Sequence, residues 1–103
     1  MTRSIVLSEA EADLDEILDD LEVRAGKLTA LRYGRDFELA FERIGRFPLT
    51  GSPRPRLGPK RRSVIVQPYL IFYDFLAADD TVRILRILHS QRNITKKDFR
   101  TKR

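Results

Sequence analysis

The amino-acid sequence predicts an α+β fold in which a helical hairpin packs on one face of a small, mainly antiparallel sheet. Apolar residues first recur at helical spacing between residues 14 and 47. Four of the five prolines then fall within residues 48–59, which indicates a loop. Three short apolar runs follow, as expected for neighbouring strands. With a short strand at the start of the chain, the predicted order is β-α-α-β-β-β.

The first predicted strand covers residues 3–7. Ser8 and Glu11 have the spacing of a capping box, so we expect Ser8 to start a helix that ends at Gly26. One side of this helix is apolar and the opposite side is acidic, and we interpret the acidic side as a solvated surface. The apolar stripe comprises Leu14, Ile17, Leu18, Leu21 and Ala25, and the acidic side comprises Asp13, Asp15, Glu16, Asp19, Asp20 and Glu22.

The second predicted helix runs from about Thr29 to Phe47 and stops at Pro48. Gly34 lies inside it, which costs roughly 1 kcal/mol relative to alanine and suggests close packing against the first helix. Its apolar residues fall on one face that we expect to lie in the core. They are Ala30, Tyr33, Phe37, Ala40, Phe41, Ile44 and Phe47.

Residues 48–59 are expected to form a stiff, extended connection with neither strand nor helix, from which Arg54 and Arg56 project. Residues 62–67 and Tyr69–Leu76 read as strands separated by Pro68. Val82–Leu88 fits a strand or a helix. We favour a strand because the run is short, lies between turn signals and follows a strand across a tight turn.

Arg86 poses a problem of charge, because an arginine within an apolar strand is costly to bury without a partner. Simple alternation places Arg86 on one face with Val82, Ile84 and Leu88, and His89 on the other with Leu85 and Ile87. We expect the helices to cover one face of the sheet and to leave the other open. We therefore predict that Arg86 has an acidic or carbonyl partner.

Composition limits the range of functions. A chain of 103 residues with 42% hydrophobic and 34% charged residues fits one globular domain. It has no cysteine, and its N-terminus lacks a long apolar segment, so we expect a cytoplasmic protein without disulfides or a membrane segment. One histidine and no glycine-rich nucleotide loop predict no metal and no cofactor.

Charge divides the chain into two parts. Residues 1–26 contain eight acidic and two basic side chains, for a net charge of −6. Residues 27–103 contain eighteen basic and seven acidic side chains, for a net charge of +11. A basic field of this kind attracts phosphate backbones or an acidic protein, although charge alone fits a solubilising surface equally well.

The order of elements and several segments resemble the RelE/ParE superfamily of bacterial toxin–antitoxin toxins. The resemblance covers nearly the whole chain. It is carried by SEAEADLDEILDDL (8–21), Gly51 in the proline loop, RRSVIVQPYLIFYDF (61–75) and RILRILHSQRNI (83–94). The last two resemble the ParE-type, plasmid-stabilisation branch. The resemblance implies a toxin domain over residues 1–93 and a basic tail over 94–103, which is either frayed or a short helix.

The branch determines the activity that the resemblance implies. ParE-type toxins inhibit DNA gyrase by binding, whereas RelE-type toxins cleave mRNA on the ribosome. Nuclease members depend on a cluster of Lys and Arg on the sheet, often with an arginine in the aromatic strand, and usually have a tyrosine or a His-Tyr pair near the C-terminus. Here Leu70 occupies the position of that arginine, Ser90 follows His89, and no tyrosine occurs after Tyr73. We therefore expect a gyrase-binding toxin, neutralised in a hetero-oligomer by a ParD-like antitoxin that wraps the hairpin and the open face of the sheet.

The alternative is a ribosome-dependent mRNA endoribonuclease. In that case His89 is the base or acid, arginines stabilise the phosphorane charge, and Tyr69 or Tyr73 stacks a base. The catalytic set for this alternative is Arg61, Arg86, His89 and Arg92. The set expected to bind antitoxin or target is Arg61, Arg62, Tyr69, Tyr73, Arg83, Arg86, His89 and Arg92.

Overall fold

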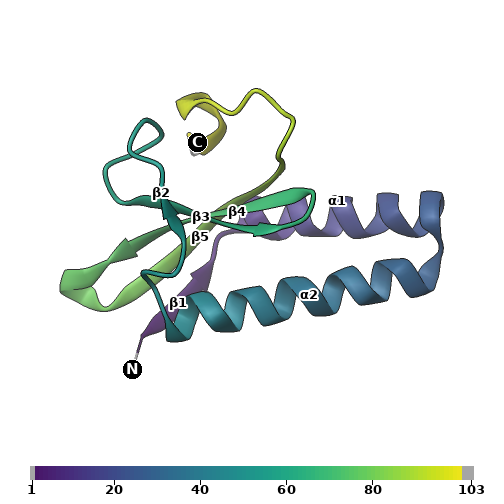
Figure 1. The fold of residues 1–103 in the computed structure, drawn as a ribbon, viewed down its shortest axis with the longest axis horizontal. Coiled ribbons are helices and arrows are strands. Elements are labelled where there is room, and N and C mark those ends of the chain that lie inside the picture. Colours follow the sequence, from purple (N-terminus) through teal and green to yellow (C-terminus); the bar gives the residue numbers. More distant parts are fainter. Residues whose placement is uncertain (1, 101–103) are drawn as a thin grey trace.

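Two long helices lie on one face of a five-stranded sheet (Figure 1) in the computed structural model of the chain, which describes residues 2–100. This confirms the predicted fold class and the choice of a strand over residues 82–88. The elements in order are β1 (Arg3–Val6), α1 (Ser8–Ala25), α2 (Lys27–Arg46), β2 (Ser52–Pro53), β3 (Arg61–Val66), β4 (Tyr69–Leu76), a 3₁₀ turn (Ala77–Asp79), β5 (Thr81–His89) and a second 3₁₀ turn, η2 (Lys96–Phe99).

The strands are arranged in the order β1-β5-β4-β3-β2. β1 runs parallel to β5, and the other pairs are antiparallel. The expectation that the proline loop contains no strand was wrong, because Ser52 and Pro53 pair with Ser63 and Arg62. Proline is tolerated there since β2 is an edge strand, where a missing N–H does not break the ladder.

The start of α1 also differs from the prediction. Leu7 occupies the N-cap position, and no side chain caps the helix. The Ser8 hydroxyl instead donates to Glu9 Oε1 at 3.2 Å, so the predicted capping box was wrong. The reason is that β1 leads directly into α1: the Leu7 amide donates to Ile84 O at 2.9 Å, which fixes the helix entry from the sheet.

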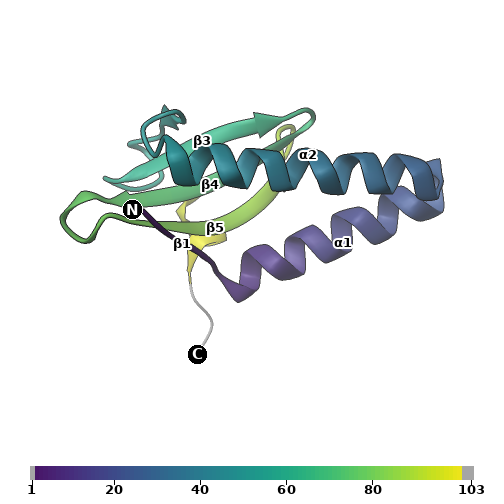
Figure 2. The same cartoon turned by 90° about the horizontal axis from the view of Figure 1, so that it is seen from below.

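The two helices meet at Gly26, whose φ of 94° is readily adopted only by glycine. The hairpin is offset along the sheet, so this turn projects past the strands (Figures 1 and 2). Gly34 is not needed for close packing, because an added Cβ would lie an ordinary 3.8 Å from Leu18 Cδ1. Ala25 and Phe47 are exposed, contrary to the prediction that they join the apolar faces.

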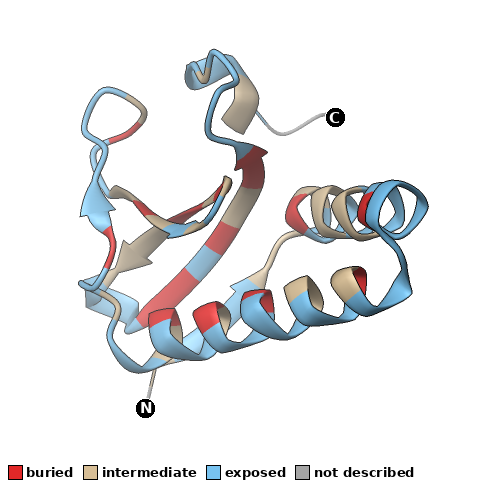
Figure 3. Cartoon of the chain, turned by 45° about the vertical axis from the view of Figure 1, so that its right-hand side comes forward, coloured by how far each residue is buried: buried red, intermediate tan, exposed pale blue. Residues whose placement is uncertain are grey.

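The core lies between the hairpin and the sheet. Figure 3 shows the buried residues on the strands and on the helix sides that face them. α1 contributes Ala10, and α2 contributes larger side chains at helical spacing, as predicted. The buried cluster comprises Ala10, Phe37, Ala40, Ile44, Tyr69, Ile71, Tyr73, Val82, Ile84 and Ile87.

A bulge in β5 changes which residues share a face. Tyr73 pairs with Ile84 but Phe72 pairs with Arg86, so Leu85 is an extra residue. The alternation therefore reverses, and Ile87 joins Ile84 in the core. The predicted grouping of Arg86 with Val82 and Ile84 was wrong for this reason.

The face opposite the helices, called the far face below, is not left open as predicted. The C-terminal turn η2 folds onto it, and the Phe99 ring lies 5.2 Å from the Phe72 ring, edge to face. Thr95 and Asp98 form a capping box at the start of this turn. Residues 96–99 thus form the short helix that was one of the two alternatives for the tail. No helix among residues 2–100 has the length and apolarity to cross a membrane.

Candidate partner-binding surface

Arg86 lies at the centre of an intramolecular network. Its Nε donates to Asp13 Oδ2 at 2.7 Å and its Nη2 to Asp13 Oδ1 at 2.9 Å. Its Nη1 donates to Asp98 O at 2.6 Å. Both side chains of the ion pair are mostly buried, and the hydrogen bond to Asp13 raises the pKa of Arg86. The prediction of an acidic or carbonyl partner is confirmed: the carboxylate belongs to Asp13 of α1, and the carbonyl to Asp98.

Asp13 was missed by the sequence analysis, which treated the whole acidic side of α1 as solvated. It also accepts the Ile87 amide at 2.9 Å, on the edge of β5 that β1 does not reach. The position of Asp13 in the sequence already indicated that its side chain is not fully solvated. Asp13 stands three residues after Ala10 and four before Ile17, so it borders the apolar stripe.

Arg61 is held in a similar way on the neighbouring strands. Its guanidinium bonds both carboxylate oxygens of Asp74, at 2.7 and 3.3 Å, and donates to Leu57 O at 3.0 Å. Its Cζ lies 4.4 Å from the centre of the Phe99 ring. Only 13% of the Arg61 side chain is exposed. Arg61 therefore braces the proline loop and η2 and does not present a free cation.

Arg62 and Tyr73 fix the start of the proline loop. Arg62 Nη1 donates to Gly51 O at 2.7 Å and to Leu49 O at 3.3 Å. The Tyr73 hydroxyl accepts the Gly51 amide at 2.9 Å and donates to Pro48 O at 2.7 Å. Burial raises the pKa of Tyr73. Both side chains serve the fold in these positions.

Tyr69 is also buried, with its ring against Tyr33, Phe37 and His89. Burial raises the pKa of Tyr69 as well. Neither Tyr69 nor Tyr73 presents a ring for stacking a base, so that expectation was wrong. A base-stacking tyrosine needs an exposed ring face, and these two are covered by the hairpin and the loop.

Arg83, His89 and Arg92 are the exposed members of the predicted set. His89 Nδ1 accepts the Gln91 amide at 3.1 Å, and Arg92 pairs with Asp98.

His89, Arg92 and Arg86 line one groove between α1 and β5, whereas Arg61 does not. Carboxylates of α1, including Glu16 and Asp20, line the same groove. The structure thus brings three of the four proposed catalytic residues together, but in an acidic setting.

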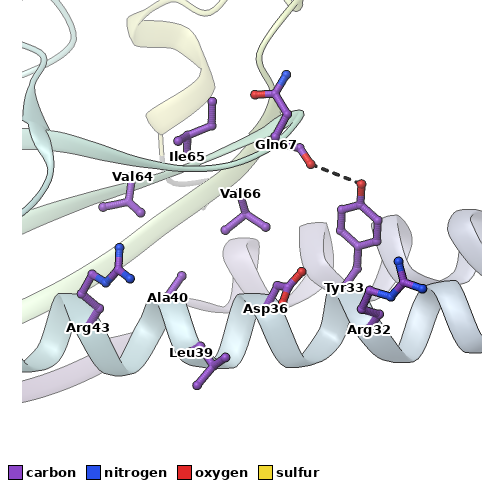
Figure 4. Close-up of a pocket in the computed structure, with 10 residues that line it drawn as sticks. All are labelled: Arg32, Tyr33, Asp36, Leu39, Ala40, Arg43, Val64, Ile65, Val66 and Gln67. Atoms are coloured by element: carbon purple, nitrogen blue, oxygen red, sulfur yellow. Dashed lines mark hydrogen bonds between the residues drawn. The ribbon is translucent and has the colours of Figure 1, made fainter.

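A second groove, of about 480 Å³, lies between α2 and β3 (Figure 4). Val64 and Val66 point from the strand toward α2, and Ala40 points back from the helix. Arg32 and Arg43 lie toward its two ends. The apolar lining and flanking cations fit a protein segment with apolar and acidic residues.

The edge of β3 beside this groove is uncovered over Val64–Val66, because among residues 2–100 β2 pairs only with Arg62 and Ser63. The Arg54 amide donates to Arg61 O, which shows that Arg61 turns its peptide groups to this edge. Alternate residues of an antiparallel strand share that direction, so Ile65 presents its N–H and C=O outward. This site, which we call the β3 edge, is a position where a partner strand can add.

Comparison with known proteins identifies the family. Residues 5–94 match the family model of the ParE toxin of the type II toxin–antitoxin system parDE. The chain belongs to this family. Its fold is similar to that of the chromosomal ParDE system from P. aeruginosa, with a TM-score of 0.75 and 25% identity over 88% of this chain and 98% of that chain.

The toxin is also similar to a chain of the RelBE2 toxin–antitoxin complex from Mycobacterium tuberculosis. The TM-score is 0.63 and the identity 25%, over 85% of this chain and 96% of that one. No curated protein gives a significant match. Both structural neighbours are toxin–antitoxin systems, which supports an antitoxin partner for this toxin. In this context, the two grooves and the β3 edge are candidate surfaces for protein binding.

Within the described residues, no group of three or more histidine, aspartate or glutamate side chains could hold a metal ion. Arg61, Arg86 and Asp13 each make three side-chain hydrogen bonds. Sequence reasoning identified the two arginines and missed Asp98, which accepts from Arg92 and from the Thr95 amide. The spacing of Thr95 and Asp98, a capping-box pattern, was the available signal.

Proposed function

We propose that this toxin acts by binding DNA gyrase, in the cytoplasm, and is neutralised by a ParD-like antitoxin in a hetero-oligomer. One observation favours gyrase binding over mRNA cleavage. The guanidinium groups of Arg61 and Arg86 are both occupied by carboxylates of the toxin itself. A nuclease needs such cations free, to stabilise the charge that develops on the phosphorane.

The groove beside His89 also argues for protein binding. Glu16 and Asp20 line it, and their charges repel an RNA phosphate, although Arg24 forms an ion pair with Asp20. The similarity to the P. aeruginosa ParDE system favours a ParD-like partner, while the similarity to RelBE2 keeps mRNA cleavage as the alternative. In that alternative His89 is the proton-transfer group.

A paired assay with purified toxin separates the two functions. One arm measures DNA supercoiling by gyrase, and the other measures transcript cleavage during in vitro translation. We expect loss of supercoiling with intact transcripts. Codon-register cleavage on ribosomes that His89→Ala abolishes would refute the proposal and establish the nuclease alternative.

We further propose that an extended segment of the antitoxin docks at the β3 edge and fills the α2–β3 groove. Support comes from the outward peptide groups of Ile65 and from the apolar lining flanked by Arg32 and Arg43. The net charge of +5 of this toxin also attracts acidic partners. Main-chain hydrogen bonds would supply affinity, and the groove would select the side chains.

The Ile65→Pro variant tests this docking mode, because proline removes the outward N–H but is tolerated at an edge. The matched control, Ile65→Ala, loses the side chain and keeps the N–H. We expect Ile65→Pro to weaken antitoxin binding about 10-fold or more, as for loss of a hydrogen bond at an interface, and Ile65→Ala to weaken it less. Equal affinities of the two variants, each shown to be folded by circular dichroism, would exclude strand addition at this edge.

A further inference from the structure

Seven exposed basic side chains lie on or beside the far face of the sheet, and none has an ion pair with a described residue. They come from three parts of the chain: the proline loop, β5 and the C-terminal segment. Figure 1 shows the loop after β2 and the C-terminal turn on the same side of the sheet, opposite α2. We call this set the basic face. Its members are Arg54, Arg56, Lys60, Arg83, Lys96, Lys97 and Arg100.

The carboxylates among these residues are already engaged. Asp74 is bound by Arg61, and Asp98 is bound by Arg92. Besides Asp74 and Asp98, the hollow beside Arg83 is lined by one more carboxylate among the described residues, the half-buried Glu9. The basic face therefore keeps a large excess of positive charge. On α2, by contrast, three exposed acidic residues, Asp36, Glu38 and Glu42, lie between the basic residues of the two ends.

The proline loop restricts the backbone that carries its cations and fixes the Arg54 side chain. Prolines 53, 55 and 59 restrict the backbone around Arg54 and Arg56. The Arg54 amide donates to Arg61 O at 2.8 Å, and the Leu57 amide donates to Arg54 O at 3.0 Å. Arg54 Nε donates to Ser63 Oγ at 2.8 Å. Binding through a preorganised loop loses less conformational entropy than binding through a flexible one.

The chemistry of this face fits nucleic acid better than an acidic protein. Protein interfaces have a core depleted in charge and anchored by aromatic side chains. The aromatic rings here, Phe72 and Phe99, pack against each other, and Arg61 covers Phe99. The exposed charged groups are Arg and Lys donors, around a hollow lined by Leu57, Leu70 and Ile94. Such donors contact phosphate oxygens without reading sequence.

We infer that the basic face binds the phosphate backbone of duplex DNA. This inference rests on the proposed function, because gyrase is an enzyme that holds DNA. A toxin with a DNA-binding face docks on the gyrase–DNA complex through two surfaces at once, so its affinity for the complex exceeds that for either component. The α1–β5 and α2–β3 grooves remain available to protein partners.

The test measures binding of the purified full chain to a fluorescent DNA duplex of about 20 base pairs, by anisotropy over a series of salt concentrations. The triple variant Arg54→Glu, Arg56→Glu and Lys60→Glu removes the loop cations. The matched control, Lys27→Glu, Arg35→Glu and Arg46→Glu, makes the same change in net charge on exposed positions of α2. Thermal unfolding establishes that both variants are folded.

We expect the basic-face variant to lose at least about 10-fold in affinity, and its slope of log K against log salt to fall by about 0.9 for each phosphate that the variant no longer neutralises. The control should lose much less. Equal losses in the two variants, absence of DNA binding by the natural sequence, or tighter binding of a single-stranded RNA of equal length would each overturn the inference.

The assay contains no gyrase, so its outcome is separable from that of the proposed function. DNA binding by a toxin that leaves supercoiling unaffected supports the basic face and contradicts gyrase as the target. Inhibition of gyrase to the same extent by the natural sequence and by the basic-face variant contradicts the role of this face.

Discussion

Arg83 and Arg86 are three positions apart on β5 and have opposite surroundings. Arg86 is mostly buried and bonded to Asp13 and to Asp98 O, whereas Arg83 is exposed on the far face. Two features cause the difference. The bulge at Leu85 sets the direction of the Arg86 side chain. β1 pairs with β5 only as far as Ile84, so the edge of β5 beyond it is open to Asp13 of α1. An arginine in an apolar strand thus stabilises the fold when a carboxylate of the same chain pairs with it, and remains available to a partner when none does.

Arg61 and Arg54 differ in the same way, although their backbones are hydrogen-bonded to each other beside β2 and β3. Arg61 pairs with Asp74 and lies over Phe99, while Arg54 Nε donates to the Ser63 hydroxyl and Arg54 has no ion pair within residues 2–100. Breaking a mostly buried pair leaves a charge without compensation, whereas removing an exposed cation leaves nothing unsatisfied. Stability and partner binding should therefore respond to different arginines.

Asp13→Ala is expected to give the largest effect. It leaves the Arg86 guanidinium and the Ile87 amide without their acceptor, which should lower the free energy of unfolding by about 3 kcal/mol. Urea denaturation followed by circular dichroism measures the change. Asp15→Ala, two residues along α1 on an exposed position, is the control and should change stability by about 0.5 kcal/mol or less. Similar losses in both variants would mean that Asp13 is as solvated as its neighbours.

Phe99→Ala is expected to have the next largest effect, about 2 kcal/mol, because it removes the ring packed on Phe72 and beneath Arg61. The neighbouring exposed residue provides the control, Arg100→Ala. Thermal unfolding of both variants also tests the expected boundary between residues 1–93 and the basic tail. If Phe99→Ala leaves the melting temperature unchanged, the C-terminal turn does not contribute to the stability of the fold.

Sequence patterns sufficed for the fold because local signals agreed with one another. Periodicity placed both helices, Gly26 marked the turn, and the prolines located the loop. The site depended on non-local facts. The partner of Arg86 lies 73 residues away on Asp13, and the bulge that turns Arg86 to its position is set by pairing with β4. Neither the register of β4 and β5 nor the docking of Phe99 is encoded in spacing along one segment.

Tyr73→Phe extends the comparison to a neutral polar group that serves the fold. The variant leaves the Gly51 amide and Pro48 O without their shared partner, which should cost about 1–2 kcal/mol. Burial raises the pKa of Tyr73 above its unfolded value of about 10. The folded state thus holds the phenol proton more tightly, so this stability is present below about pH 10 and is lost as the pH rises above it.

Unfolding free energies at pH 8 and above pH 10 test both parts of the Tyr73 prediction. The natural sequence should lose more stability between the two pH values than Tyr73→Phe does. Tyr33→Phe is the control, since the Tyr33 hydroxyl donates to Gln67 O at 3.2 Å in an exposed position. An alkaline loss of the same size in Tyr73→Phe and in the natural sequence would show that another group is responsible.

Arg83→Gln is expected to have the smallest effect, and it returns to the two arginines of β5. The Arg83 guanidinium forms no ion pair with residues 2–100, so its removal should change the free energy of unfolding by about 0.5 kcal/mol or less. Arg86→Gln, three residues further on, leaves Asp13 without its cation and should be clearly destabilising. Because the two changes are chemically identical and on one strand, their difference measures the surroundings alone. Equal stabilities would mean that the Asp13–Arg86 pair contributes no more to the fold than an exposed charge.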